Sequence, residues 1–172
     1  TTAGVLGGGL HIAMHAVGKI TLFFCAGAIM VGAHKTEIST MDGLGLKMPF
    51  TFGAFFLGSL SVIGLPPMGG SWSKWYLMLG ALEAEQMVMM AVLMASSLLS
   101  IGYLMPVVGR AFFRPPPEDD HHDDDQADGH GNGLQEAPLL CVLPPVLTGI
   151  GCIVMFFYAE DIYLLLTGMV TP

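Results

Sequence analysis

Three titratable side chains follow one another at intervals of four in an apolar stretch near the start of the chain: His11, His15 and Lys19. In an α-helix, residues four apart share a face and lie about 6 Å apart along the axis, so the three form one row. Imidazole titrates near pH ~6.5 and both accepts and donates a proton. The row predicts a proton relay. The alternative is that the histidines only hydrogen-bond across helices and that Lys19 is a fixed ion-pair partner.

A fourth candidate, Lys74, directly follows the stretch Gly64-Leu65-Pro66-Pro67-Met68-Gly69-Gly70. Proline lacks the amide hydrogen and glycine is conformationally permissive, so this stretch cannot be a continuous helix. We expect a helix break at Pro66, Pro67, Gly69 and Gly70. Such a break places free backbone groups and water next to the amine of Lys74. The alternative is a lysine that extends from a helix start to the membrane surface.

Lys19 and Lys74 are the two basic residues inside apolar segments, whereas the other four lie in loops or at helix ends. A charged side chain inside a bilayer costs about 2.5–3.5 kcal/mol on insertion scales and usually has a function. Burial weakens the hold of a lysine on its proton, so that the lysine can load and release it. Both lysines are therefore predicted to relay protons.

The composition requires a membrane environment. Hydrophobic residues make up 53% of the 172 residues and charged residues 12%, against about 25% charged residues in soluble domains. These values argue against a water-soluble enzyme, a nucleic-acid binder and a disordered chain.

The net charge of −8 comes from one segment. Eight of the 14 acidic residues lie between positions 115 and 136, and no lysine or arginine falls there: Glu118, Asp119, Asp120, Asp123, Asp124, Asp125, Asp128 and Glu136. The segment also contains His121, His122 and His130, which makes a metal site conceivable. A solvated, disordered connection is the favoured interpretation, because a charge run has nothing to bury.

Five apolar segments follow from hydropathy and from turn residues: 10–33, 49–65, 72–82, 87–108 and 138–158. A helix needs roughly 20 apolar residues to cross a bilayer. We predict an all-α integral membrane protein with about five transmembrane helices, one broken at Pro66–Gly70. Residues 1–114 would form the conducting helices, 115–137 the acidic loop and 138–172 a C-terminal transmembrane helix. The basic pairs Lys35/Lys47 and Arg110/Arg114 are expected on opposite sides of the membrane.

Two further features bear on the class of protein. The chain begins Thr1-Thr2-Ala3, without an initiator methionine or a basic leader, which suggests a fragment or a processed chain. Cys25, Cys141 and Cys152 lie in apolar runs and are expected to be buried small hydrophobes. No metal-binding spacing, dinucleotide fingerprint or haem-ligand pair is visible in the sequence, so we expect no cofactor and no metal.

Three motifs resemble one family of membrane proteins. They are His11-x3-His15-Ala16-x2-Lys19-x2-Leu22-Phe23, then Asp42-Gly43-Leu44, then Gly64-Leu65-Pro66-Pro67-x2-Gly70-x2-Ser73-Lys74. The chain resembles the antiporter-like membrane subunits shared by respiratory NADH:quinone oxidoreductase and the multisubunit Mrp sodium/proton antiporters. The resemblance covers about residues 6–113, and within the family the chain looks most like the D-type subunits of the Mrp antiporters.

The resemblance implies a subunit of about fourteen helices in two inverted repeats, of which this chain would supply helices ten to fourteen. Lys19 would match the lysine of the tenth helix, and Lys74 the lysine of the broken twelfth helix, where protons exit. An aromatic residue of the family is replaced by Ser71, whose packing role Trp72 could take. The glutamate and lysines of the family's first repeat are absent from this sequence.

We therefore expect part of a proton-translocating subunit of a multisubunit cation/proton antiporter, with a Lys/His relay and no enzymatic activity of its own. The alternatives are a proton-pumping subunit of a respiratory NADH:quinone oxidoreductase or related hydrogenase complex, or a non-transporting scaffold fragment. The expected partners are other membrane subunits of the same complex, the missing N-terminal half of the parent subunit and the lipid bilayer, with no nucleic acid. The expected location is the cell inner membrane, as a multi-pass protein.

Overall fold

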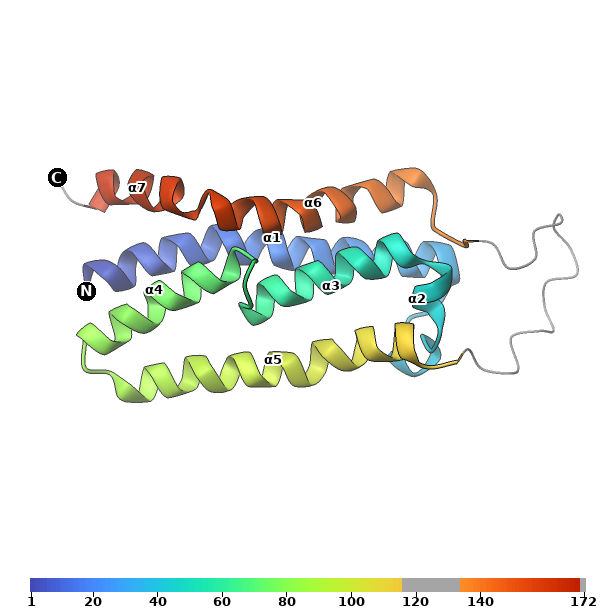
Figure 1. The fold of residues 1–172 in the computed structure, drawn as a ribbon, viewed down its shortest axis with the longest axis horizontal. Helices are drawn as coiled ribbons and strands as arrows, with labels where there is room; N and C mark the ends of the chain where they lie inside the picture. Colours follow the sequence, from blue (N-terminus) through green and yellow to red (C-terminus); the bar gives the residue numbers. More distant parts are fainter. Residues whose placement is uncertain (116–133, 171–172) are drawn as a thin grey trace, which may run out of the picture.

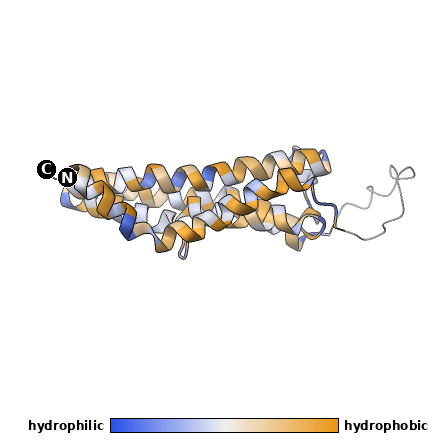
Figure 2. Cartoon of the chain, turned by 90° about the horizontal axis from the view of Figure 1, so that it is seen from above, coloured by the Kyte–Doolittle hydropathy of each residue, from blue (hydrophilic) through white to orange (hydrophobic). Residues whose placement is uncertain are grey.

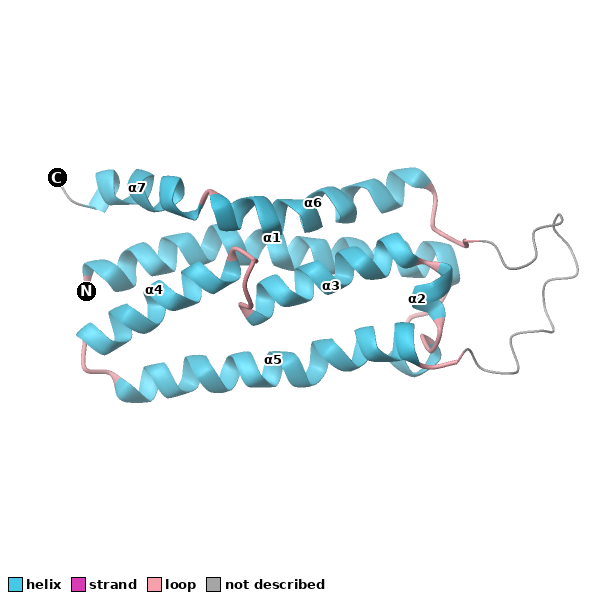
Figure 3. Cartoon of the chain, viewed as in Figure 1, coloured by secondary structure: helices cyan, strands magenta, loops and turns pink. Residues whose placement is uncertain are grey.

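The computed structural model describes residues 1–115 and 134–170, and within these ranges it consists of helices and loops without a strand (Figure 3). The helices are α1 (Thr2–Ala33), α2 (Leu44–Lys47), α3 (Pro49–Ile63), α4 (Gly70–Glu83), α5 (Met87–Phe113), α6 (Leu139–Phe157) and α7 (Ala159–Val170), with a 3-10 turn at Ile38–Thr40. Pro49 occupies the first turn of α3, where its missing amide hydrogen costs no helical bond.

The helices form an elongated bundle in which the chain runs from end to end four times (Figure 1). The first pass is α1, the second is α3 followed by α4, the third is α5, and the fourth is α6 followed by α7. The expectation of about five transmembrane helices was therefore too high. With 15 and 14 residues, α3 and α4 are each only about 22 Å long, too short to cross a bilayer alone. They lie end to end and share one pass.

The outside of the bundle is apolar, as the prediction of an integral membrane protein requires. Among the described residues, three helices are long and apolar enough to span a membrane: α1, α5 and α6. In their most apolar stretches no more than 28% of the residues are buried inside the structure. Many large hydrophobic side chains of these helices are exposed, and hydrophobic residues recur along the ribbon of every long helix (Figure 2). Exposed apolar surface of this extent marks contact with lipid or with other membrane proteins. The chain is an all-α, multi-pass membrane protein.

Small residues set the packing of α1 against α4. A Cβ atom added at Gly80 would collide with the backbone of Gly4, and one added at Gly7 would lie 2.8 Å from the backbone nitrogen of Leu77. Without a hydrophobic driving force in lipid, helices associate through such close backbone contact between small residues. This contact fixes the height of α4 along α1.

The loop before α3 and the C-terminal end of α5 lie at the same end of the bundle. Asp42 forms ion pairs with Arg110 and Arg114, each at 3.6 Å. The amide of Gly43 donates a hydrogen bond to the carbonyl of Arg110 at 3.2 Å. The prediction that the Lys35/Lys47 and Arg110/Arg114 pairs lie on opposite sides was therefore wrong. Because α3 and α4 make one pass, the chain returns to this end after α5.

The segment that follows the acidic run is attached to the α2–α3 corner. The amide of Gln135 donates to the carbonyl of Lys47 at 2.8 Å. One carboxylate oxygen of Glu136 accepts from the amide of Phe50 at 2.7 Å, and the other accepts from the hydroxyl of Thr51 at 2.7 Å. Glu136 thus caps α3, although the sequence assigned it to the acidic loop. Residues 116–133, with His121, His122 and His130, lie outside the described residues.

The sequence predicts one C-terminal transmembrane helix over residues 138–172, whereas the described residues of this range form two helices, α6 and α7. Glu160 and Asp161 lie in the first turn of α7, where the helix dipole stabilises negative charge. Cys25 and Cys152 are buried and Cys141 is half-buried, all as free thiols.

Candidate functional site

The interrupted pass has its non-helical segment from Gly64 to Gly69, as the sequence predicts. Helix α3 ends where Gly64 adopts the left-handed conformation, with a φ of +89°, which glycine adopts without a steric penalty. The amide of Gly64 donates to the carbonyl of Leu60 at 2.9 Å. Pro66 and Pro67 follow and prevent the helix from continuing.

The break is held against two neighbouring segments. The amide of Gly69 donates to the carbonyl of Cys152 in α6 at 3.0 Å. Gly70 is already the first residue of α4, and a Cβ atom there would collide with the carbonyl oxygen of Ser61. The two half-helices therefore approach more closely than any residue larger than glycine would allow.

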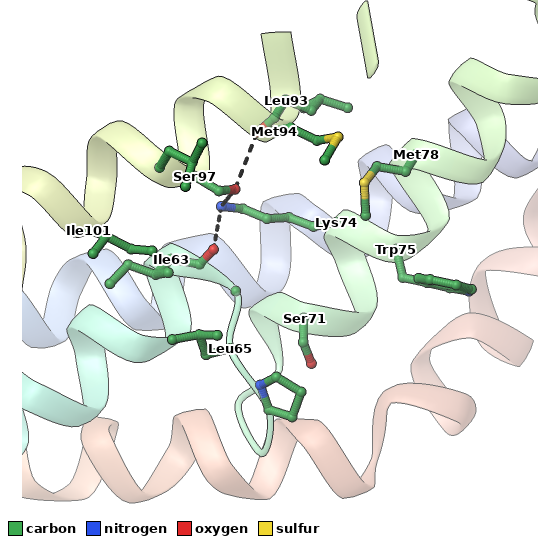
Figure 4. Close-up of a pocket in the computed structure, with 13 residues that line it drawn as sticks. Ile63, Leu65, Ser71, Lys74, Trp75, Met78, Leu93, Met94, Ser97 and Ile101 are labelled. Carbon is green, nitrogen blue, oxygen red and sulfur yellow. Dashed lines mark hydrogen bonds between the residues drawn. The ribbon is translucent and has the colours of Figure 1, made fainter. Parts of the chain in front are cut away.

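Lys74 lies one turn into α4, and its ammonium group reaches back to the end of α3. Its Nζ donates to the carbonyl of Ile63 at 2.8 Å and to the hydroxyl of Ser97 in α5 at 2.8 Å (Figure 4). The carbonyl of Ile63 is one of the last in α3, where the helix leaves carbonyl groups without a helical partner and carries partial negative charge. The break thus creates an acceptor for the lysine.

A cavity of about 450 Å³ adjoins this lysine, between the break, α4 and α5. Its lining consists mostly of apolar side chains, and Lys74 is the one charged residue among the described residues that form it (Figure 4). An ammonium group has three donors, of which Lys74 uses two. The volume exceeds that of a water molecule, about 30 Å³, and the polar side chains of the lining are Ser71, Lys74 and Ser97, so water that enters the cavity would bind next to the third donor.

His11 contacts the start of α4 on the side of α1. Its Nδ1 lies 2.9 Å from the hydroxyl oxygen of Ser73, and this hydroxyl donates to the carbonyl of Gly70 at 3.0 Å. The tautomer of the His11 ring decides which of the two groups donates in the contact between His11 and Ser73. The ring of His15 stacks on that of His11 at a centroid distance of 5.2 Å. Both histidines thus lie near the break, and the Ser73 that His11 contacts is next in sequence to Lys74.

Lys19 does not join this group. Its side chain is exposed on α1, on the same side as the exposed residues Ile12, Ile20 and Phe23. Within residues 1–115 and 134–170 it forms no hydrogen bond or ion pair. The predicted row of His11, His15 and Lys19 therefore begins inside the bundle and ends on its uncovered face.

Two partners of Lys74 were missed by sequence reasoning. Ser97 follows Ser96 in an otherwise apolar helix, and hydroxyl groups in such helices often bond across to a neighbour. That pattern was a usable signal. Nothing in the sequence indicated the carbonyl of Ile63, because it can accept a hydrogen bond from Lys74 only when Gly64 ends the helix.

These features define a multi-pass α-helical membrane protein with an interrupted helix and a lysine at the interruption. The chain belongs to the family described as NADH:quinone oxidoreductase/Mrp antiporter, transmembrane region, whose sequence profile matches residues 1–100.

Its relatives come from both branches of that family. The chain is 38% identical over 154 residues to NADH-quinone oxidoreductase subunit N of Desulforudis audaxviator, an alignment that covers 89% of this chain and 31% of the relative. It is 33% identical over 113 residues to the D subunit of the Na(+)/H(+) antiporter of Alkalihalophilus pseudofirmus, covering 66% and 23% respectively. It is 38% identical over 76 residues to Hydrogenase-4 component B of Escherichia coli, covering 44% and 11%. The chain thus spans about a third or less of each relative.

Proposed function

We propose that this chain forms part of the proton path of a multisubunit cation/proton antiporter in the cell inner membrane. The observation that carries the proposal is the placement of Lys74. Its ammonium group is held by a carbonyl at the end of α3 and by Ser97, beside a cavity large enough for water. A buried amine that exchanges its proton with such water can relay it.

His11 and His15 would extend the path along α1. Imidazole both accepts and donates a proton, the rings of His11 and His15 are stacked, and Ser73 links His11 to the turn that carries Lys74. Lys19 would continue the row toward whatever covers the exposed face of α1. Pro66, Pro67, Gly69 and Gly70 serve the path by keeping the break open.

Two of the relatives are subunits, one of an NADH-quinone oxidoreductase and one of a Na(+)/H(+) antiporter. We propose that this chain likewise works with other membrane subunits and with an N-terminal half of its parent subunit. In this role the chain moves ions and performs no redox step. Any oxidoreductase activity would belong to the assembly.

A second candidate is a proton-pumping subunit of a respiratory NADH:quinone oxidoreductase. The observation that favours it is the alignment with subunit N of an NADH-quinone oxidoreductase, which covers 89% of this chain. The same residues would relay protons in both settings. The two candidates differ in the assembly that drives transport.

The test replaces Lys74 or Lys19 by alanine in the intact parent protein. Proton exchange in inverted vesicles, followed by quenching of a pH-sensitive dye, should be abolished. Membrane insertion should be retained, because the cost of placing the charge in the bilayer disappears. Lys47→Ala is the matched control, since Lys47 lies at the end of α2 and outside the proposed path. Normal exchange in the Lys74 and Lys19 variants would refute the relay.

A further inference from the structure

A second pocket lies on a different face of α4 from Lys74, where the junction of α6 and α7 packs against it. Its volume is about 320 Å³. Five of its lining residues are aromatic and one is acidic: Trp72 and Tyr76 from α4, Phe156 and Phe157 from α6, and Tyr163 and Glu160 from α7. Ala159 and Leu164 complete the lining.

The aromatic rings form a connected series. Tyr76 and Tyr163 stack with centroids 4.6 Å apart, while Trp72 lies 5.9 Å from Phe156 and 6.4 Å from Tyr76. The face of an aromatic ring carries partial negative charge and attracts cations, most strongly in tryptophan. Rings gathered around a small pocket are typical of sites for substituted ammonium groups.

Glu160 adds a full negative charge to this pocket. Its carboxylate forms no hydrogen bond or ion pair with any residue in the described ranges. It lies in the first turn of α7. Glu160 is exposed, so its carboxylate is free to meet a ligand, and a cation in the pocket would have this charge on one side and aromatic rings on the other.

We propose that this pocket binds an organic ammonium cation, with Glu160 as the counter-charge and the ring of Trp72 as the π surface. A divalent metal ion would need several oxygen ligands, and the lining offers one carboxylate. A neutral apolar ligand would leave that carboxylate unpaired. The volume lies at the small end of the range of ligand pockets, about 300–1,000 Å³. The binding of this cation does not depend on the proton path.

Binding is tested on the parent protein in nanodiscs of phosphatidylglycerol by calorimetric titration with choline. The comparison ligand is the neutral alcohol in which carbon replaces the quaternary nitrogen. Choline should bind at least about tenfold more tightly, because the neutral analogue keeps the shape and loses both charge interactions. Equal affinity of the two ligands, or no binding of choline, would overturn the proposal.

Matched variants distinguish a loss of choline binding from a loss of folding. Glu160→Gln should abolish choline binding, whereas Asp161→Asn, the next residue and outside the lining, should leave it unchanged. Trp72→Phe should weaken binding and Trp72→Leu should remove it, with the same thermal unfolding midpoint in both. An equal loss in Asp161→Asn, or full binding in Trp72→Leu, would contradict the assignment.

The ammonium group could belong to a soluble amine or to a lipid headgroup. Adding phosphatidylcholine to the nanodiscs distinguishes a soluble amine from a lipid headgroup. Competition with free choline identifies the headgroup as occupant, and unchanged choline affinity identifies a soluble cation. Both results support the ammonium site.

Discussion

Lys74 carries a positive charge near the middle of the bundle, and two oxygen atoms offset the cost of placing it there. One is the carbonyl of Ile63 and the other is the hydroxyl of Ser97, both at 2.8 Å. Hydrogen bonds to charged groups contribute about 1.5–3 kcal/mol each. These two hydrogen bonds therefore stabilise the ammonium form of Lys74, whereas burial destabilises it.

Ser97→Ala should slow proton exchange without abolishing it. The variant leaves the ammonium group with one protein acceptor and a small void that water can enter. The rate is measured by dye quenching in inverted vesicles over a series of pH values. Ser96→Ala is the control, because its hydroxyl has no part in the contact with Lys74. Equal rates in the two variants would show that the Ser97 contact has no role in transport.

Gly64→Ala should damage both stability and transport. The left-handed backbone costs a non-glycine residue roughly 1–2 kcal/mol, and the added Cβ would lie 2.7 Å from Cδ of Lys74. Gly102→Ala in α5 is the matched control, since nothing lies within 4 Å of its added Cβ. Thermal unfolding in detergent should show a lower midpoint for Gly64→Ala alone. An unchanged midpoint would contradict the proposed role of this turn.

At the scale of the element, the break was predictable and its surroundings were not. Proline and glycine act locally, so Pro66, Pro67 and Gly69 predict the interruption from sequence. That α3 and α4 share one pass depends on contacts between distant residues, such as Gly69 with Cys152 and Gly80 with Gly4. Local pattern cannot reveal such contacts, and five passes were predicted for that reason.

The cap on α3 gives a prediction at the same scale. Glu136→Ala should lower the stability by about 1–2 kcal/mol, the usual cost of losing an N-terminal cap, because the amides of Phe50 and Thr51 lose their acceptor. Glu136→Gln keeps one oxygen acceptor and should lose less. Gln135→Ala is the control, since its bond to Lys47 uses the backbone amide. Unfolding in denaturant measures all three, and equal stability of Glu136→Ala and Gln135→Ala would contradict the cap.

At the scale of the whole molecule, the four passes bring both pairs of basic residues to the same end of the bundle, which bears on the orientation in the membrane. Lys35, Lys47, Arg110 and Arg114 belong to loops and helix ends at one end of the bundle, and the turn with Glu83 and Glu85 forms the other end (Figure 1). Cytoplasmic loops carry an excess of lysine and arginine. The basic end is therefore expected in the cytoplasm, which the sequence alone could not decide while the two basic pairs were placed on opposite sides.

Labelling of single cysteines tests the number of passes and the orientation together. Thr36 and Ala84 are both exposed, at the basic end and at the opposite end respectively. In a background with Cys25, Cys141 and Cys152 replaced, a membrane-impermeant reagent should label Ala84→Cys in intact cells and Thr36→Cys only in inverted vesicles. If α3 and α4 each crossed the membrane, both positions would be labelled from the same side. Labelling of Thr36→Cys alone in intact cells would keep the four passes and reverse the orientation, and with it the side on which protons would exit at Lys74.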